Sequence, residues 1–286
     1  MFENILIVGG MNPNFDIVLK SICSMSKLGT RKCTLFHCIS NDEANETVSS
    51  SIMELYQEEL KVQGKILTDE GYEVKLMVTS GDLRDEVRKA IKSEDFSLVV
   101  VGAAENSLFG AFLERDAAYS IMSDMSLPLL LVRVPSSPSR KTLDETECNL
   151  YSHIMVPIDY SENAEKVIER VRWMAESGAD RVTLIHVADN IGHRIGEGAN
   201  HVSVEMNEKE LLQRVAENSI KGFAEVDSLV RIGSAADEII RAAEDTGATL
   251  IVMGSRGKSL VRELYLGSVS HNVARHSPVS VMLVPV

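Results

Sequence analysis

Short apolar runs alternate with helix-like segments in this chain, and the alternation occurs twice. The apolar runs of the first half lie at 4–8, 33–39, 73–79, 97–101 and 129–134, and those of the second half at 153–158, 181–187, 226–232, 249–253 and 279–284. Between the second-half runs, apolar residues such as Ala164, Val167, Ile168 and Val171 recur at helical spacing. Strands that alternate with helices form mostly parallel sheets covered on both faces. The sequence therefore predicts an α/β fold.

The two halves can be aligned with each other. Residues 81–102 match residues 233–254 without a gap, and prolines flank both final strands at Pro128 and Pro135 and at Pro278 and Pro285. The segment from Gly102 to Pro128 is two residues longer than the segment from Gly254 to Pro278, so we expect a longer connection in the first half. A repeat of this length indicates a duplicated domain rather than a solenoid. We expect domains at 1–135 and 152–286, joined by a Pro/Ser-rich linker at 136–151.

The charge balance excludes several classes of partner. The chain has 286 residues and a formal net charge of −13. A protein that binds nucleic acid or anionic lipid needs basic surface, so neither partner is expected. No apolar run approaches the ~20 residues that cross a bilayer, and the first residues lack the basic region of a signal peptide. These features predict a cytoplasmic protein with no membrane partner.

Four cysteines occur in the first half, at Cys23, Cys33, Cys38 and Cys148. No two have the C-x-x-C spacing of a metal or redox site. We interpret them as small apolar residues in a reducing compartment, with a metal or redox role as the alternative.

Glycines and hydroxyls gather near the end of the chain. Gly254 and Gly257 follow the apolar run 249–253, and Gly267 and Ser268 come ten residues later. Glycine lets backbone N–H groups approach an anion closely, and a helix that begins near Ser268 would direct its positive end at a phosphate. A Walker A loop would need glycine at position 252, which is Val, and no G-x-G-x-x-G follows a strand.

The pattern G-x2-G-x9-G-S resembles the nucleotide-binding signature of the universal stress protein family. Val156 to Asp159 also match the V-P-x-D pattern of that family. The resemblance implies two five-stranded, mostly parallel domains of the adenine nucleotide α-hydrolase-like type. Because dimers of the family pair through their last strands, it also implies that the two halves form an internal pseudo-dimer, with a further homodimer open.

The resemblance assigns ATP as the ligand, with Mg²⁺ as a possible ion bridging the phosphates. Asp159, after Pro157, would reach the nucleoside, and the Val187 backbone would hold the adenine edge. The remaining positions would line the ribose and phosphates: Met253, Gly254, Gly257, Gly267, Ser268, Val269 and Ser270.

Several of these residues have a simpler interpretation. Asp159 and Ser268 could cap helices, and Gly254 could form a tight turn. Arg256, Lys258 and Arg262 could pair with phosphate oxygens, although a solvated face is the simpler interpretation. In the loop 188–204, His193 and His201 could bind metal, and a mobile loop is the alternative.

The first half departs from the motif. Gly10 stands opposite Asp159, Glu105 opposite Gly257, and Arg115 and Asp116 near Gly267 and Ser268. Acidic side chains facing a phosphate site would repel the ligand. We therefore expect the first half to have lost ATP binding and to serve as a scaffold or partner surface.

These observations predict an ATP-binding protein with a nucleotide-dependent role in stress response or signalling. The sequence offers no clear catalytic base, because a lone histidine such as His271 is more often structural. A slow ATPase stays open. So do an adenylating transferase and an interaction module that binds no nucleotide.

Overall fold

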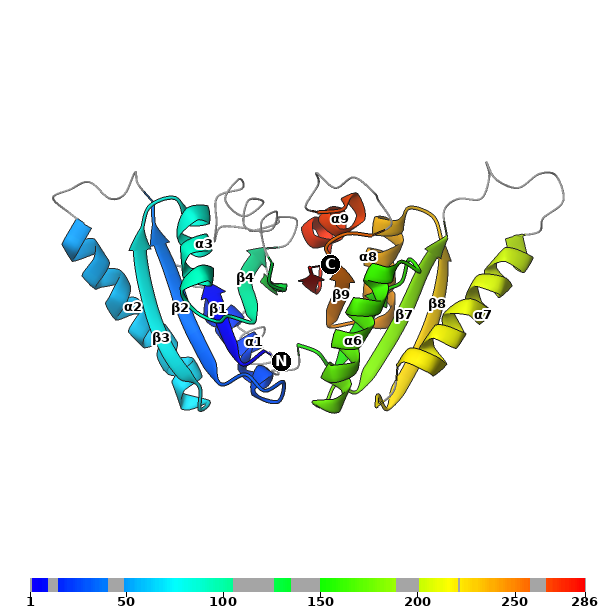
Figure 1. Cartoon of the computed structure of the whole chain (residues 1–286), viewed down its shortest axis with the longest axis horizontal. Coiled ribbons are helices and arrows are strands. Elements are labelled where there is room, and N and C mark those ends of the chain that lie inside the picture. The colour runs from blue at the N-terminus through cyan, green and yellow to red at the C-terminus, as the bar shows by residue number, and fades with distance from the viewer. Residues whose placement is uncertain are drawn as a thin grey trace. The chain divides into compact units, whose positions relative to one another are not determined.

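The computed structural model describes residues 2–9, 15–40, 49–104, 126–134, 150–188, 201–220, 222–257 and 266–285. Within these ranges, the side chains of 49–51, 104 and 201–205 are not described. The chain divides into two compact units, Met1–Asn149 and Leu150–Val286. Figure 1 shows that each unit consists of strands with helices packed against them.

The first unit has strands β1 (Asn4–Val8), β2 (Lys32–Ile39), β3 (Glu73–Ser80), β4 (Leu98–Ala104) and β5 (Leu129–Val134), and helices α1 (Phe15–Ser21), η1 (Cys23–Ser26), α2 (Ser49–Asp69) and α3 (Leu83–Ser93). Its strand order is β3-β2-β1-β4-β5, and its ladders are parallel. The side chains of Leu98 to Val101 are fully buried, as a parallel sheet covered on both faces requires.

The second unit has strands β6 (His153–Pro157), β7 (Arg181–Ala188), β8 (Glu225–Ile232), β9 (Leu250–Gly254) and β10 (Ser280–Val284), and helices α6 (Glu162–Glu176), α7 (His201–Ser219), α8 (Ala235–Thr246) and α9 (Ser268–His276). Its order is β10-β9-β6-β7-β8, again parallel, which is the first unit's order read from the other end. Both units therefore confirm the predicted α/β class.

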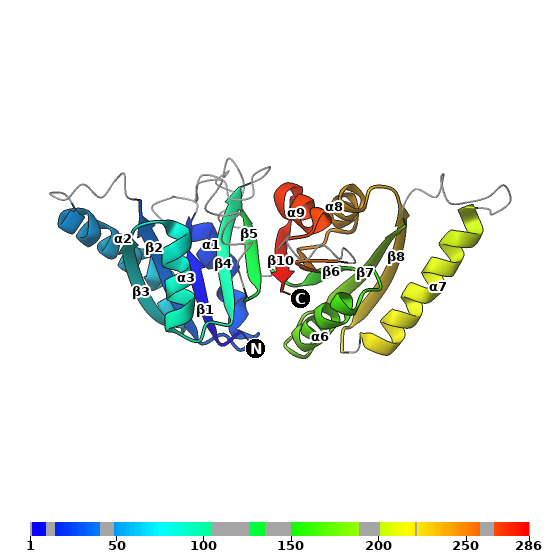
Figure 2. The ribbon, with the colours of Figure 1, turned by 45° about the horizontal axis from the view of Figure 1, so that its top comes forward.

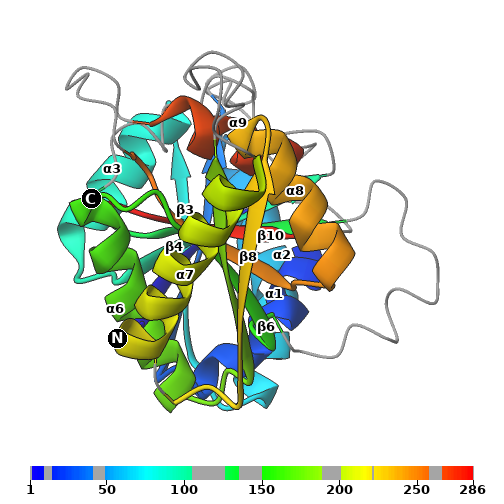
Figure 3. The ribbon, with the colours of Figure 1, turned by 90° about the vertical axis from the view of Figure 1, so that its right-hand side faces the viewer.

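The helices of the second unit form two layers. Helix α8 packs against α9, and Figure 2 shows the two together on one side of the strands. Helices α6 and α7 form the other layer, in which Arg172 of α6 donates a 2.9 Å hydrogen bond to the carbonyl of Ser219 in α7. Figure 3 shows α7 running along β8.

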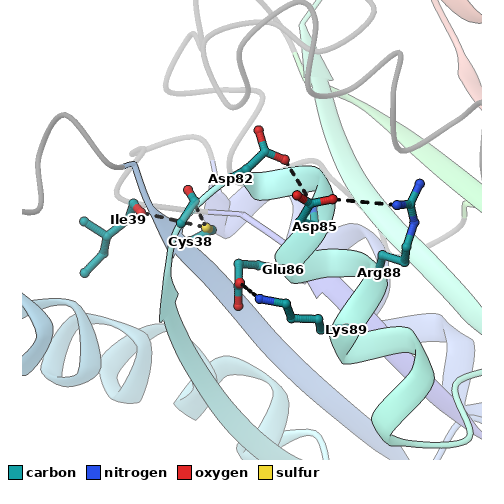
Figure 4. A network of polar contacts seen from close by, with 8 residues as sticks. Cys38, Ile39, Asp82, Asp85, Glu86, Arg88 and Lys89 are labelled. Atoms are coloured by element: carbon teal, nitrogen blue, oxygen red, sulfur yellow. Dashed lines mark hydrogen bonds and ion pairs between the residues drawn. The ribbon is translucent and has the colours of Figure 1, made fainter.

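The repeat extends to individual side chains. Gly81 (φ 146°) and Gly233 (φ 153°) adopt the same left-handed backbone, which glycine tolerates. Over each lies a glutamate that pairs with a cation three residues later: Glu86 with Lys89 at 2.5 Å, and Glu238 with Arg241 at 2.6 Å. Figure 4 shows the first of these networks, in which the Cys38 thiol donates to the Gly81 carbonyl at 3.5 Å.

Strand register revises one detail of the alignment. Val99 pairs with Leu129, and Ile251 pairs with Val281, so both connections span 30 residues (129 − 99 and 281 − 251). The prediction of a connection two residues longer in the first half is wrong. It relied on aligning the flanking prolines, which occupy different register positions in the two units.

Candidate nucleotide site

The predicted site residues gather where the chain changes direction across the second sheet. Strand β6 lies between β9 and β7, so the chain turns to one side after β6 and later returns to the other. In open α/β sheets, the crevice at the carboxyl ends of such strands is the usual ligand position. Asp159 follows β6, and Gly254 ends β9. The topology therefore places both residues beside this crevice.

Asp159 and Gly257 lie directly against each other. A Cβ atom built on Gly257 would lie 2.7 Å from Oδ2 of Asp159, closer than real side chains approach. Only glycine allows this approach without moving the carboxylate. The glycine after β9 and the carboxylate after β6 thus lie together in the fold, although they are 98 positions apart in the sequence (257 − 159).

Ser161 orients the Asp159 carboxylate. Its N–H donates to Oδ1 at 3.0 Å, and its hydroxyl donates to the same oxygen at 2.6 Å. Ser161 is the N-cap residue of α6, but its side chain makes no capping bond to the helix. The interpretation of Asp159 as a helix cap is therefore wrong, because Ser161 is the N-cap and Oδ1 of Asp159 instead stabilises the turn before α6. Oδ2 faces Gly257.

The two ends of the glycine segment are held together. The N–H of Gly267 donates to the Ser255 carbonyl at 2.8 Å, and the Ser270 hydroxyl donates to the Gly254 carbonyl at 2.8 Å. Ser270 is 4% exposed. Because its hydroxyl proton is used on Gly254, Ser270 has its backbone N–H left to offer an anion.

Helix α9 begins beside this closure. Its N-cap is Gly267, which has no side chain to cap the helix, and Ser268 is the first helical residue. The interpretation of Ser268 as the cap is therefore wrong. Ser268 is exposed and Val269 half-buried. The first N–H groups of a helix lack intrahelical acceptors, so this end of α9 offers donors and a positive dipole to an anion.

Strand β7 extends past the end of β6. Pro157, the last residue of β6, pairs with Ile185, whereas β7 continues to pair with β8 as far as Ala188. The Ile185 carbonyl accepts from Ile158 on the β6 side at 2.7 Å. Main-chain groups two residues apart face the same side of a strand, so those of Val187 face the crevice. Met253 is 5% exposed, and its side chain packs in the core.

A cluster of Tyr160, His186 and Glu208 lies next to Asp159, and no sequence motif indicates it. Nδ1 of His186 lies 2.7 Å from the Ile158 carbonyl, and its Nε2 lies 3.6 Å from Oε2 of Glu208. The Tyr160 ring is tilted against the His186 ring, with centroids 4.6 Å apart. Burial and then the Glu208 carboxylate raise the pKa of Tyr160 above its usual value.

The internal repeat contains a sequence signal for this cluster, because both halves have a histidine at the same position. His37 of the first unit occupies the position of His186, and its Nδ1 lies 2.9 Å from the Gly9 carbonyl. A histidine kept at the same place in both halves indicates a shared contact rather than a surface residue.

Comparison with known proteins identifies the family. The model of the universal stress protein family matches residues 150–285. A universal stress protein of Methanocaldococcus jannaschii is 34% identical over an alignment of 155 residues, and the match covers 47% of this chain and 95% of the relative. Another, from Bacillus subtilis, is 28% identical and covers 47% of this chain and 99% of the relative.

The chain belongs to the universal stress protein family. Among solved structures, a universal stress protein of Archaeoglobus fulgidus has a TM-score of 0.70 at 20% identity, covering 98% of this chain and 96% of that chain. A putative universal stress protein of Pseudomonas aeruginosa has a TM-score of 0.63 at 14% identity, with coverages of 99% and 93%. These two likenesses extend the shared fold to both units.

Some predicted features of this universal stress protein lie outside the described residues. They are Gly10, Glu105, Arg115, Asp116, Cys148, His193, Lys258 and Arg262, together with the His201 side chain. In the described part of the chain, no cluster of His, Cys, Asp and Glu could hold a metal ion. No helix there is both long and apolar enough to span a bilayer.

The remaining titratable candidates have structural surroundings. His271 is half-buried, and burial followed by the nearby Arg275 lowers its pKa. Cys23 and Cys33 are buried, and burial raises the pKa of Cys33 to about 12. A thiol with so high a pKa is a poor nucleophile, which supports the interpretation of Cys33 as an apolar core residue.

Proposed function

We propose that the second unit binds ATP and that nucleotide occupancy serves a stress-response or signalling role. The observation that carries this proposal is the contact of Asp159 with Gly257 at the crevice between β6 and β9. The family resemblance assigns an adenine nucleotide to these same positions. The first unit would then act as a scaffold or as a partner surface.

The chemistry of the site sets the direction of the ligand. A carboxylate repels phosphate but accepts hydrogen bonds from ribose hydroxyls, so Asp159 would face the nucleoside. The start of α9 has the opposite preference, because its N–H groups and dipole attract negative charge. The Val187 main chain offers a donor and an acceptor to the adenine edge. ATP would therefore lie with its base toward β7 and its phosphates toward Ser268.

A bound Mg²⁺ would take most of its ligands from phosphate oxygens and water. Mg²⁺ commonly keeps several waters and binds substrate phosphates rather than an all-protein cage. The described residues, which contain no metal-ligating cluster, fit that mode of binding.

Isothermal titration of the whole chain with ATP tests the proposal, and one ATP per chain is expected. Gly267→Val should abolish binding, because its side chain would occupy phosphate space. The fold should survive, since a Cβ there meets its nearest atoms at 3.6 Å, an ordinary contact. Circular dichroism checks the fold.

The matched control is Arg115→Val at the aligned position of the first half, which should leave the titration unchanged. A folded Gly267→Val variant with unaltered affinity would remove the phosphate-loop assignment. A stoichiometry near two would show that the first unit also binds.

A further inference from the structure

Tyr160 has an unusual backbone conformation at the proposed site. Its φ is 56°, and it is the one non-glycine residue with positive φ among the described residues. Such a conformation is uncommon for an aromatic residue and persists where surrounding contacts enforce it. Tyr160 sits between Asp159 and Ser161, the two residues whose hydrogen bonds orient the carboxylate. The turn therefore depends on whatever holds Tyr160.

His186 contacts this turn in two ways. Its Nδ1 must carry the proton in the 2.7 Å contact, because the Ile158 carbonyl can only accept. This bond holds the residue immediately before Asp159. The His186 ring also lies against the Tyr160 ring. One side chain of β7 thus restrains the main chain on both sides of Asp159.

Glu208 supports the histidine from helix α7. Its Oε2 atom is buried and makes no hydrogen bond to the residues that the structure describes. It lies 3.6 Å from Nε2 of His186, an ion-pair contact when the ring is protonated. The Tyr160 hydroxyl also reaches the Glu208 main-chain carbonyl, at 3.5 Å. His186 is 12% exposed and the Glu208 side chain 30%, so water screens the contact only in part.

The first unit keeps half of this arrangement. His37 holds the Gly9 carbonyl as His186 holds that of Ile158. Helices α2 and α7 begin 152 residues apart, at Ser49 and His201, so Tyr56 stands where Glu208 does. Tyr56 stacks on His37 with centroids 4.1 Å apart. The histidine beside Asp159, in the half that keeps the nucleotide motif, is thus the one with a carboxylate, that of Glu208, next to its ring.

We infer that His186, supported by Glu208 and Tyr160, is a positioning residue that aims the Asp159 carboxylate at the nucleoside. This inference rests on the proposed function for its effect on binding. The effect of His186 on the turn does not require a ligand. Without His186, the turn from Asp159 to Ser161 loses its restraint, and the carboxylate loses its fixed direction.

The first test needs no nucleotide. His186→Phe keeps a ring against Tyr160 and removes the bond to the Ile158 carbonyl. Amide hydrogen exchange at Ser161, followed by NMR, should become at least several-fold faster, because that amide is protected by Asp159. The control His37→Phe breaks the equivalent bond in the first unit and should leave Ser161 exchange unchanged. Unchanged Ser161 exchange in folded His186→Phe would overturn the inference.

The second test is a double-mutant cycle on ATP affinity. His186→Phe should weaken binding about tenfold, the effect of one lost charged hydrogen bond. Asp159→Ala should weaken it to a similar degree, and the double variant should match Asp159→Ala alone. Losses that add would show that His186 acts other than through Asp159.

If His186→Phe does not fold, Glu208→Gln provides a second variant, since it keeps the size of the side chain and removes its negative charge. It should raise Ser161 exchange and lower ATP affinity by less than His186→Phe is expected to, and no change in Ser161 exchange would overturn the inference. If wild-type protein binds no ATP, the proposed function fails, whereas Ser161 exchange still decides whether His186 positions the turn.

Discussion

At the end of its central strand, the first unit packs the Phe15 ring over Gly9, whereas the second unit has Ile158 and Ala164 at the aligned positions. A Cβ on Gly9 would lie 1.9 Å from the Phe15 ring, so a larger residue there would require the ring to move. In each unit, the nitrogen of this residue still bonds to the neighbouring strand, at 3.0 Å for Gly9 and 2.7 Å for Ile158.

The comparison shows that the sheet and the site can diverge separately. Ladders, left-handed glycines and glutamate–cation pairs recur in both units, because they stabilise the fold of each one. Side chains beyond the strand ends contribute less to the sheet and have changed. This pattern supports the proposal that the first unit keeps the scaffold without the nucleotide site. The pairing of the halves as an internal pseudo-dimer stays a prediction.

The largest expected difference between the units concerns Gly257. Gly257→Val should lower ATP affinity at least about a hundredfold, because its Cβ would displace the Asp159 carboxylate from 2.7 Å away. Glu105→Val, at the aligned position of the first half, should change nothing. Titration of both variants measures the difference. Residual binding of one ATP by folded Gly257→Val would place the ligand elsewhere.

The next effect concerns stability in the first unit. Gly9→Ala should lower the free energy of unfolding by about 1–3 kcal/mol, the usual range for overpacking. Adding Phe15→Leu should recover part of the loss, since the clash is with that ring. Urea denaturation followed by circular dichroism measures both. Gly9→Ala at wild-type stability would show that the ring moves aside freely, so the packing would not distinguish the units.

A smaller effect should separate the two ends of the ligand. Asp159→Ala should weaken ATP, ADP and adenosine alike, whereas Ser268→Ala should mainly reduce the preference for ATP over ADP. Each should lower ATP affinity by about tenfold, or ~1.4 kcal/mol. Affinities for the three ligands give the result. The reverse pattern would mean that the ligand lies in the opposite direction.

The smallest effect is expected where the units agree. Arg241→Ala should change the free energy of unfolding by less than about 0.5 kcal/mol, because its side chain is 68% exposed and its pair with Glu238 is screened. Lys89→Ala in the first unit should have an equally small effect on the urea midpoint. A large loss in one unit alone would show that the repeated pair has acquired different roles.

Much of the fold was predictable from sequence because it depends on local patterns. Apolar runs and their spacing predicted the strands, and the ungapped match of residues 81–102 with 233–254 predicted the repeat. The errors concern contacts that local patterns leave open. Ser268 was interpreted as a possible helix cap, yet the N-cap of α9 is Gly267 and Ser268 is the first helical residue. A serine hydroxyl has several partners within reach, and spacing alone does not select among them.

By itself, the sequence determined which chemical groups follow the strands: a carboxylate after β6, glycines after β9 and hydroxyls at the start of α9. Only the tertiary structure decided which atoms meet. It turns Oδ2 of Asp159 to Gly257, gives the Ser270 hydroxyl to the Gly254 carbonyl, and brings His186 and Glu208 to Tyr160. These contacts join segments far apart in the chain, so packing of the whole unit, rather than residue spacing, selects them.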